Sequence, residues 1–443
     1  MSQKAALFTL GCKLNQYETM FLQEQLEKCG YDIVPFESMA DVYVVNTCTV
    51  TNKGDYHSRM KIRQARHTNP DALIVATGCS AQVNPHKLAG ISDLVLGNAE
   101  KGDLIHYLAS WKKRDCADIR VSGLDRQSRF QPYFISRFSG YTRAFLKIQE
   151  GCDQRCSYCI VPAARGRNRS AIPEDILSQA RQLVENGYQE LVLTGIHLGT
   201  YGQDLARELE RKITLCELLE ALLACTARSG NGSLRLRLSS IEPTEFTEEL
   251  KLLLTTSARI CAHLHVPLQS GDDSILKAMH RPYTSAFYKE LIEELVSKRP
   301  EMAIGADIMV GFPGETEESF QRTVQFVEAL PLAYLHVFKY SPRPGTEAAS
   351  LSHQIDGQTK KERCTLLRQV SRSTSYRFRR RFLHTCLPAL VLEQKDRQTG
   401  RHIALSGNYI KVVTEGAKDL VNQQVSVEIT DVSEGSTMGK VVP

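Results

Sequence analysis

The sequence predicts an α/β protein with three parts: an N-terminal doubly wound parallel α/β domain, a central partial (βα)6 barrel and a small all-β barrel at the C-terminus. Three observations support this. Short apolar runs alternate with amphipathic stretches up to about residue 115, a similar alternation resumes at residue 144, and β-rich segments separated by turns fill the last part of the chain. The length of 443 residues agrees with two or three domains.

The first domain is expected at residues 1–115. Its amphipathic stretches predict helices over 16–30 and 53–67, the first ending at Gly30 as a C-cap. The expected strands are the apolar runs 5–10, 42–46, 73–77 and 93–97.

Residues 116–143 lack this rhythm and are polar, so we expect a linker over 116–138. The central barrel is then expected over 139–375, with a helix at 173–187 that has Pro173 in its first turn and Gly187 at its end. Its expected strands are 144–149, 190–195, 234–239, 263–268, 303–311 and 334–341. The small β barrel is expected over 376–443, with strands at 388–394, 402–407, 409–416 and 423–432.

Composition predicts a cytoplasmic protein without a membrane segment. Hydrophobic residues make up 42% and charged residues 24% of the chain, and the net charge is +5. No apolar run approaches the ~20 residues that span a bilayer, and the N-terminal MSQKAALFTLGCKLN is typical of a first strand rather than a signal peptide. In a reducing compartment the thirteen cysteines, an odd number, do not indicate a disulfide framework.

Cys152, Cys156 and Cys159 form a C-x3-C-x2-C motif. Zinc usually takes four ligands, and no nearby fourth Cys or His completes such a set. Three closely spaced thiolates suit three corners of an iron–sulfur cube, with the fourth iron left for a non-protein ligand. The alternative is three unrelated buried cysteines after a strand.

This motif, with Tyr158 before the last cysteine and a strand before the first, resembles the radical S-adenosylmethionine (SAM) superfamily. The resemblance implies a [4Fe–4S] cluster whose open iron chelates SAM, with Tyr158 at the cofactor site. Electron transfer from the reduced cluster would release methionine and a 5′-deoxyadenosyl radical.

Cys12, Cys48 and Cys79 each follow the end of a predicted parallel strand. Such strand ends face a common crevice, so three thiols distant in sequence would converge there. Taken singly, each cysteine is better explained as a small buried residue, and only the shared position favours a joint metal site.

The segments TLGCKLNQYE, NTCTVTNKGD and TGCSAQ resemble the cysteine motifs of the methylthiotransferase family. The resemblance covers the whole chain and implies an auxiliary [4Fe–4S] cluster on Cys12, Cys48 and Cys79. It also implies two SAM molecules per turnover and a C-terminal barrel of the RNA-binding TRAM type. The other cysteines show no such pattern; they are Cys29, Cys116, Cys216, Cys225, Cys261, Cys364 and Cys386.

Barrel enzymes place their chemistry at the C-terminal ends of their strands. By resemblance, the segments there line the SAM site, with polar contacts, a close backbone approach and an adenine flank supplied by Gly195, Ser240, Glu242, Gln269, Asp307, Gly311 and Phe312. Ordinary loop turns explain the glycines equally well. His197, His263 and His265 are expected to be structural, because hydrogen abstraction by a radical needs no strong base.

Two basic runs are expected to contact RNA phosphates. One follows the C-x3-C-x2-C motif and the other leads into the C-terminal barrel; their members are Arg165, Arg167, Arg169, Arg377, Arg379, Arg380 and Arg381. The alternative is that each run is only a solvated face.

The family resemblance implies a tRNA methylthiotransferase. In that chemistry the radical removes hydrogen from C2 of adenosine 37, beside the anticodon, and the carbon radical captures a methylated sulfur. LGCKLNQYE with NTCTVTNK most resembles the type acting on N6-threonylcarbamoyladenosine; the alternatives are the types acting on N6-isopentenyladenosine or on a ribosomal-protein aspartate. Flavodoxin or ferredoxin is the expected electron donor, and we expect a monomer.

Two rivals belong to other classes. One is an RNA-binding protein whose clusters only sense redox state or iron, and detection of 5′-deoxyadenosine would exclude it. The other is a radical SAM methyltransferase that transfers carbon alone, which would not need Cys12, Cys48 and Cys79.

Overall fold

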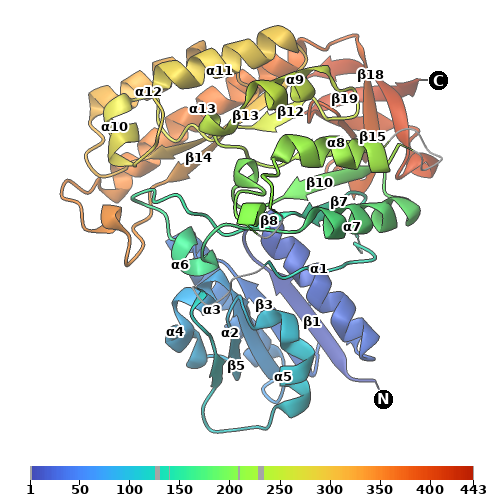
Figure 1. The fold of residues 1–443 in the computed structure, drawn as a ribbon, viewed down its shortest axis with the longest axis vertical. Coiled ribbons are helices and arrows are strands. Elements are labelled where there is room, and N and C mark those ends of the chain that lie inside the picture. The colour runs from blue at the N-terminus through green and yellow to red at the C-terminus, as the bar shows by residue number, and fades with distance from the viewer. Residues whose placement is uncertain (1, 125–129, 139, 208–209, 228–233, 443) are drawn as a thin grey trace. The chain divides into compact units, whose positions relative to one another are not determined.

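The computed structural model describes residues 2–442 except 125–129, 139, 208–209 and 228–233. The chain divides into two compact units. The first comprises Met1–Arg137, Lys147–Asp175 and Ser341–Ala349, and the second comprises Phe138–Leu146, Ile176–Tyr340 and Ser350–Pro443. Figure 1 shows the chain coloured from the N-terminus to the C-terminus. Among the described residues, we find no helix with the length and apolar character needed to cross a membrane.

The first unit is built on a six-stranded parallel sheet in the order β2-β1-β3-β4-β5-β6. Strand order reverses beside β1, as in doubly wound folds, and the predicted fold class is confirmed. The strands are β1 (Lys4–Thr9), β2 (Asp32–Ile33), β3 (Val42–Thr47), β4 (Leu73–Gly78), β5 (Leu94–Leu96) and β6 (Asp118–Arg120).

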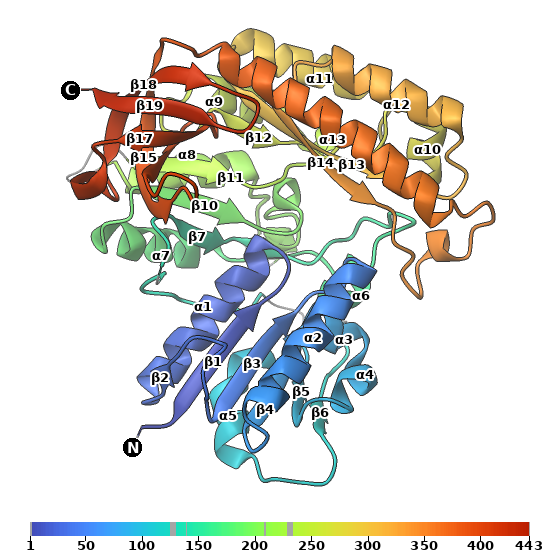
Figure 2. The same cartoon turned by 180° about the vertical axis from the view of Figure 1, so that it is seen from behind.

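Alternating side chains of these strands build one core on each face of the sheet. On one face, Val44 and Val75 pack with residues of α1 (Lys13–Lys28) and α5 (Leu104–Ser110). On the other, Tyr43 and Ile74 pack with residues of α2 (Asn52–Thr68), α3 (Cys79–Val83) and α4 (Pro85–Ala89). Figure 2 shows α2 in front of this face of the sheet. Gly30, at φ +84°, follows the C-cap of α1, as the sequence predicts.

The stretch 144–149, expected as one strand, is divided between two elements. β7 (Ala144–Lys147) joins the barrel sheet, whereas β8 (Gln149–Glu150) pairs antiparallel with β9 (Arg169–Ser170). Between β8 and β9 lie the C-x3-C-x2-C loop and the short helix α6 (Val161–Arg165).

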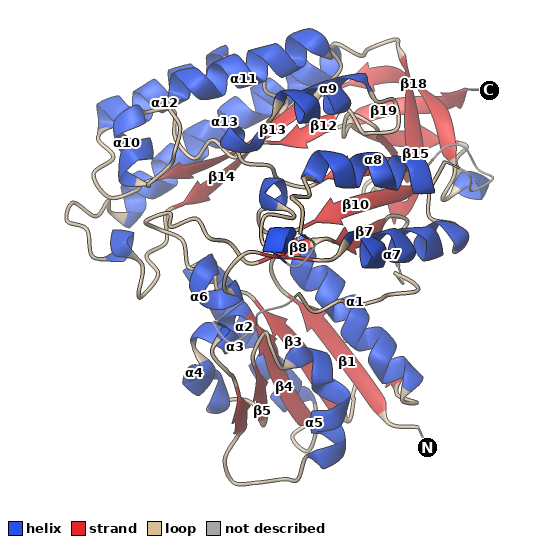
Figure 3. Ribbon diagram, in the orientation of Figure 1, coloured by secondary structure: helices blue, strands red, loops and turns tan. Residues whose placement is uncertain are grey.

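The second unit contains the partial barrel. Its strands form two three-stranded sheets, β11-β10-β7 and β12-β13-β14, which parallel bridges Leu236–Ile260 and Ser240–His265 connect. The bounds are β10 (Glu190–Thr194), β11 (Arg235–Leu238), β12 (His263–His265), β13 (Ala303–Val310) and β14 (Tyr334–Lys339). A helix follows each strand, which gives six βα units (Figure 3). The helices are α7 (Pro173–Glu185), α8 (Leu215–Cys225), α9 (Glu248–Thr256), α10 (Asp273–Ala278), α11 (Ser285–Lys298), α12 (Glu317–Ala329) and α13 (Gly357–Arg380).

Threonine caps define where four of the barrel helices begin. The side chains of Thr214, Thr247, Thr284 and Thr316 each accept a hydrogen bond from a backbone N–H in the first turn, and Thr214 forms a capping box with Glu217.

The C-terminal strands close into a five-stranded barrel in the order β15-β16-β17-β19-β18, consistent with a TRAM-like domain. The strands are β15 (Cys386–Lys395), β16 (His402–Ser406), β17 (Lys411–Glu415), β18 (Gln424–Val432) and β19 (Thr437–Val442). Phe378 and Phe382, at the end of α13 and just beyond it, pack into the same core as Ala389 and Val391 of β15. The expected domain boundary at 375/376 therefore falls inside α13, a helix that packs against both the partial barrel and the C-terminal barrel.

Candidate metal centres

Cys12, Cys48 and Cys79 lie just beyond the C-terminal ends of β1, β3 and β4, which are neighbours in the sheet. Cys12 is exposed, Cys48 is half-buried and Cys79 is buried. The three thiols therefore line a site that deepens from the surface towards Cys79.

Two glycines leave room around Cys48. A Cβ built on Gly11 would lie 3.1 Å from the Cys48 Sγ, and one on Gly54 would lie 3.5 Å from it. Burial raises the pKa of the Cys48 thiol to about 11, and the neighbouring thiols of Cys79 and Cys12 act in the same direction.

Asn15 holds together the two chain segments that lead from β1 to Cys12 and from β3 to Cys48. Its Nδ2 donates hydrogen bonds to the carbonyl of Leu10 at 2.7 Å and to that of Thr47 at 3.1 Å. The Thr47 hydroxyl in turn donates to the carbonyl of Thr77 at 2.6 Å. The chain segments that carry the three cysteines are therefore bound to one another.

The spacing of the thiols suits a cluster better than a single ion. Zinc holds sulfur at about 2.3 Å, so the sulfur ligands of one ion lie within roughly 4 Å of each other. Across the described part of the chain, the one group of three potential ligands with all atoms within 4.8 Å is His265, Asp307 and His336. Neither set of three cysteines is that compact, as expected for ligands on different corners of a cube.

Cys152, Cys156 and Cys159 lie on the loop between β8 and α6, and all three are half-buried. The backbone N–H of Cys159 donates to the carbonyl of Cys156 at 3.0 Å. The N–H groups of Gln154 and Val161 point at the sulfurs of Cys152 and Cys159, each at 3.4 Å. Backbone donors that face thiolate sulfurs are a common feature of iron–sulfur sites.

A cavity of about 400 Å³ opens beside this loop. Cys152, Gln154 and Gly166 line it together with the cationic side chains of Arg155 and Arg167. Arg167 is exposed, so it remains available to an anionic partner.

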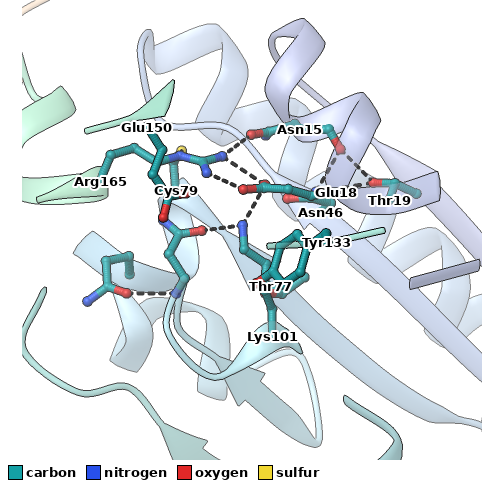
Figure 4. Close-up of polar contacts among 12 residues, drawn as sticks. Asn15, Glu18, Thr19, Asn46, Thr77, Cys79, Lys101, Tyr133, Glu150 and Arg165 are labelled. Carbon is teal, nitrogen blue, oxygen red and sulfur yellow. Dashed lines mark hydrogen bonds and ion pairs between the residues drawn. The ribbon is translucent and has the colours of Figure 1, made fainter. Parts of the chain in front are cut away.

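Two arginines of the same run lie elsewhere than expected. Arg165 is 1% exposed and Arg169 is 5% exposed, and both are paired with buried carboxylates: Arg165 with Glu18, and Arg169 with Glu150 at 3.2 Å. The expectation that these two contact RNA is wrong in this structure, because their guanidinium groups are turned inward. Figure 4 shows the buried network around Arg165.

Tyr158 lies on the cluster loop of the first unit, whereas the other residues expected at the SAM site lie at or near the C-terminal ends of the barrel strands, within the second unit. Gly195 and Ser240 follow β10 and β11, and Gly311 follows β13. Gln269 adopts φ +70°, and its backbone N–H donates to the carbonyl of Asp307 at 2.7 Å.

Asp307 is part of a polar group inside the barrel. Its Oδ1 lies 2.9 Å from Nε2 of His265 and 3.4 Å from Nδ1 of His336. Burial favours the neutral acid, but the hydrogen bonds from His265 and His336 hold the pKa of Asp307 below its usual range. The contact between His336 and Asp307 was not predicted from the sequence. The signal that could have found it is the position of His336 on β14, where it pairs with Asp307 of β13.

Two expected SAM contacts are already occupied. Glu242 is paired with Arg281, and burial raises the pKa of its carboxyl. Phe312 is fully buried and packs edge-on against Tyr340, with ring centroids 5.6 Å apart. The expectation that the Phe312 ring flanks adenine is therefore wrong for this structure, since no face of the ring reaches an open site.

His197, His263 and His265 are all buried, at 4%, 3% and 8% exposure. His197 is paired with Glu245, and His263 bonds to the Tyr334 hydroxyl at 2.8 Å. These partners agree with the structural role expected for them.

The second basic run lies at the end of α13. Arg377, Arg380 and Arg381 are exposed. Arg379 is half-buried, and its guanidinium donates to the carbonyls of Glu434 and Ser436, each at 2.8 Å. Arg379 thus joins the helix to the C-terminal barrel, whereas Arg377, Arg380 and Arg381 remain exposed.

Two protein-family models match the chain. The Radical SAM superfamily matches residues 146–327, and the Uncharacterized protein family UPF0004 matches residues 4–97. The first range contains the C-x3-C-x2-C loop and most of the barrel, and the second contains Cys12, Cys48 and Cys79.

The chain is also similar to named proteins along nearly its whole length. It is 39% identical to a threonylcarbamoyladenosine tRNA methylthiotransferase of Bacillus subtilis, covering 96% of this chain and 93% of that protein. It is likewise 39% identical to a protein of the same name from Aquifex aeolicus, covering 94% of this chain and 98% of that one.

Among solved structures, a radical S-adenosylmethionine methyltransferase from Kitasatospora setae, TsrM, has a TM-score of 0.55 at 18% identity. The match covers 79% of this chain and 77% of that one. It supports the fold.

Proposed function

The chain belongs to the radical SAM methylthiotransferase family, and from this premise we propose that it methylthiolates C2 of N6-threonylcarbamoyladenosine next to the anticodon of tRNA. The observation that carries the proposal is the similarity, over nearly the whole length of both chains, to methylthiotransferases whose names state that substrate. The two sets of three converging cysteines fit the chemistry, which needs one cluster to generate the radical and another to deliver sulfur.

Membership of the radical SAM superfamily implies a [4Fe–4S] cluster and SAM. We assign this cluster to Cys152, Cys156 and Cys159. Bound SAM and cluster would supply a 5′-deoxyadenosyl radical, which removes a hydrogen that no protein base can take. The chain's part is to hold the cluster loop rigid, and the hydrogen bond from the Cys152 N–H to the carbonyl of Gly166, 3.1 Å long, contributes to this.

The second cluster is assigned to Cys12, Cys48 and Cys79. Its support is the shared strand-end position, the glycines that leave space around Cys48, and a thiol spacing too wide for one zinc ion. A methyltransferase that moves carbon alone has no use for such a second site.

SAM itself is assigned to the polar strand ends of the barrel; Tyr158 of the cluster loop is a cofactor-site residue by the family resemblance alone. The supporting residues are Gly195, Ser240, Gln269, Asp307 and Gly311. For tRNA phosphates, the exposed Arg167, Arg377, Arg380 and Arg381 are the proposed contacts. A flavodoxin or ferredoxin as electron donor and a monomeric, cytoplasmic protein complete the proposal.

The test is mass spectrometry of tRNA nucleosides from cells that lack the protein. Loss of 2-methylthio-N6-threonylcarbamoyladenosine, with accumulation of the unthiolated nucleoside, is the expected result. Loss of the 2-methylthio form of isopentenyladenosine would reassign the tRNA substrate. An unchanged nucleoside profile would overturn the proposal and point to a protein substrate or to a role without thiolation.

A further inference from the structure

A charged side chain lies against the deepest cysteine of the auxiliary site. Arg165 Nε donates to the Sγ of Cys79, with 3.3 Å between the atoms, and both residues are buried. Figure 4 shows the guanidinium of Arg165 directed at the carboxylate of Glu18 and the side-chain oxygen of Asn15, both on α1. Arg165 is therefore fixed on two sides and presents its Nε–H to the sulfur.

The partner of Arg165 is itself firmly held. The fully buried carboxylate of Glu18 also accepts from the Lys101 ammonium at 2.5 Å. Lys101 bonds to the side-chain oxygen of Asn98 at 2.7 Å, and the amide of Asn98 donates to the carbonyl of Ala164, the residue before Arg165. This closed set of contacts leaves the guanidinium little freedom to turn away from Cys79.

Two buried cations share the carboxylate of Glu18, because both Arg165 and Lys101 are paired with it. A single carboxylate balances only one of these two charges. Among the described residues, the ion pairs next to Cys79 therefore contain more cations than carboxylates.

Unpaired buried charge is costly, so an interior with excess cations calls for an anion. Arg165 faces Cys79, one of the three auxiliary cysteines. As thiolates, these three carry more negative charge than an oxidised [4Fe–4S] core carries positive charge. A neutral thiol at Cys79 would leave the excess uncompensated. The charge imbalance is thus an observation, independent of the cysteine pattern, that points to an anionic group at this site.

We propose that Arg165 is a positioning residue of the auxiliary cluster: its hydrogen bond fixes the Cys79 sulfur and raises the reduction potential of the cluster. Donors to the sulfurs and nearby positive charge favour the reduced, more negative state. Because α6 begins two residues after Cys159, the same arginine also ties the C-x3-C-x2-C loop to the auxiliary site. This inference rests on the second cluster of the proposed function.

The experiment uses the full chain in which Cys152, Cys156 and Cys159 are changed to alanine, so that only the auxiliary cluster remains. In this background we compare Arg165, Arg165→Lys and Arg165→Gln, with Arg63→Gln, an exposed arginine of the same unit, as the control. Iron and sulfide are quantified, and a reductive titration followed by electron paramagnetic resonance gives the midpoint potential.

We expect Arg165→Gln to disfavour reduction about tenfold, or about 59 mV for one electron, and Arg165→Lys to lie between it and the parent. Arg63→Gln should match the parent. If Arg165→Gln loses its iron, the titration of Arg165→Lys decides: a lowered potential supports the proposal, and a parental one overturns it. Parental potentials in all loaded variants also overturn it. A background without iron, although Arg165 is intact, would instead overturn the second cluster itself.

Discussion

At the scale of single residues, a glycine sets the position of the buried cluster cysteine. Gly78 precedes Cys79 and adopts φ +92°, a conformation that other residues rarely adopt. A Cβ there would lie 2.3 Å from Oδ1 of Asn46 and 2.6 Å from the carbonyl of Thr47. Neither atom can withdraw without disturbing the sheet or the loop that carries Cys48.

Gly78→Ala should therefore displace Cys79 and lower the iron content from about eight atoms per chain towards four. Formation of 5′-deoxyadenosine from SAM should persist, because Cys152, Cys156 and Cys159 are untouched. Gly90→Ala is the control, since its Cβ would meet nothing within 4 Å and its φ is −70°. Equal iron contents in the two variants would contradict the assignment of Cys79.

The two sets of cysteines should also separate by function. Cys152→Ala is expected to abolish SAM cleavage, since it removes a ligand of the radical-generating cluster. Cys48→Ala is expected to leave cleavage intact and to stop thiolation. Parallel assays of 5′-deoxyadenosine and of methylthiolated nucleoside measure the two steps, and loss of both in Cys48→Ala would refute this division of labour.

At the scale of elements, one carboxylate organises the start of the barrel sheet. Glu190 on β10 is fully buried, and its oxygens lie 2.6 Å from Arg235 and 2.8 Å from Arg237, both on β11. The same two arginines donate to the carbonyls of Leu405 and Ser406 at 2.7 and 3.0 Å. Glu190 therefore orients the groups that join the barrel to the C-terminal domain.

Glu190→Gln should lower the free energy of unfolding by about 3–5 kcal/mol at pH 7, because it leaves two buried guanidinium groups undercompensated. Burial favours the neutral acid, but Arg237 and Arg235 hold the pKa of Glu190 below its usual range. Its contribution is thus complete above the unfolded-state pKa of about 4.3 and is lost as the pH falls further.

The difference in urea midpoint between this variant and the parent should accordingly be constant from pH 7 to about pH 5 and shrink below about pH 4. Glu220→Gln, on the exposed side of α8, is the control and should not move the midpoint. A midpoint difference that grows with acidity would contradict the depressed pKa.

Elements with strong apolar runs could be predicted, and short ones could not. Every expected strand of the three parts has a counterpart, because buried parallel strands read as continuous apolar runs. β6 (Asp118–Arg120) lies in the polar stretch expected to be a linker, and β19 (TMGKVV) interrupts its apolar residues with Gly439 and Lys440. Such strands are specified by their partners, β5 and β18, rather than by their own composition.

At the scale of the whole molecule, the cysteines of the candidate sites were predictable and their surroundings were not. Each of Cys12, Cys48 and Cys79 follows the end of a predicted parallel strand, so the sequence alone predicted that they lie together. The inward turn of Arg165 was hidden, because Glu18 is 147 residues away in the chain and an Arg-x-Arg-x-Arg run resembles a basic surface. Asn15 and Glu18 belong to the KLNQYE segment and follow Cys12 by three and six residues. This helical spacing places both polar side chains near Cys12, and it was the signal that could have been used.

Binding of tRNA depends on cations that stay exposed once the buried network is formed, and at the end of α13 these include Arg377 and Arg380. The Arg377 guanidinium donates to the carbonyl of Glu328 over a long 3.4 Å, and the Arg380 guanidinium lies 6.0 Å from the Tyr376 ring. Both side chains are therefore free to exchange these weak contacts for phosphates.

Changing Arg377 and Arg380 together to glutamine should weaken tRNA binding at low salt and reduce the slope of log K against log salt by about 1.4–1.8, since each phosphate contact releases about 0.7–0.9 counterion. Anisotropy titrations with tRNA between 50 and 200 mM salt measure the slope. Lys289→Gln with Lys298→Gln removes two exposed charges from α11 and is the control. The control separates a local contact from an effect of net charge. A long-range effect of charge would reduce the salt slope equally in both double variants, whereas phosphates bound at α13 would make the slope fall only in the variant of Arg377 and Arg380.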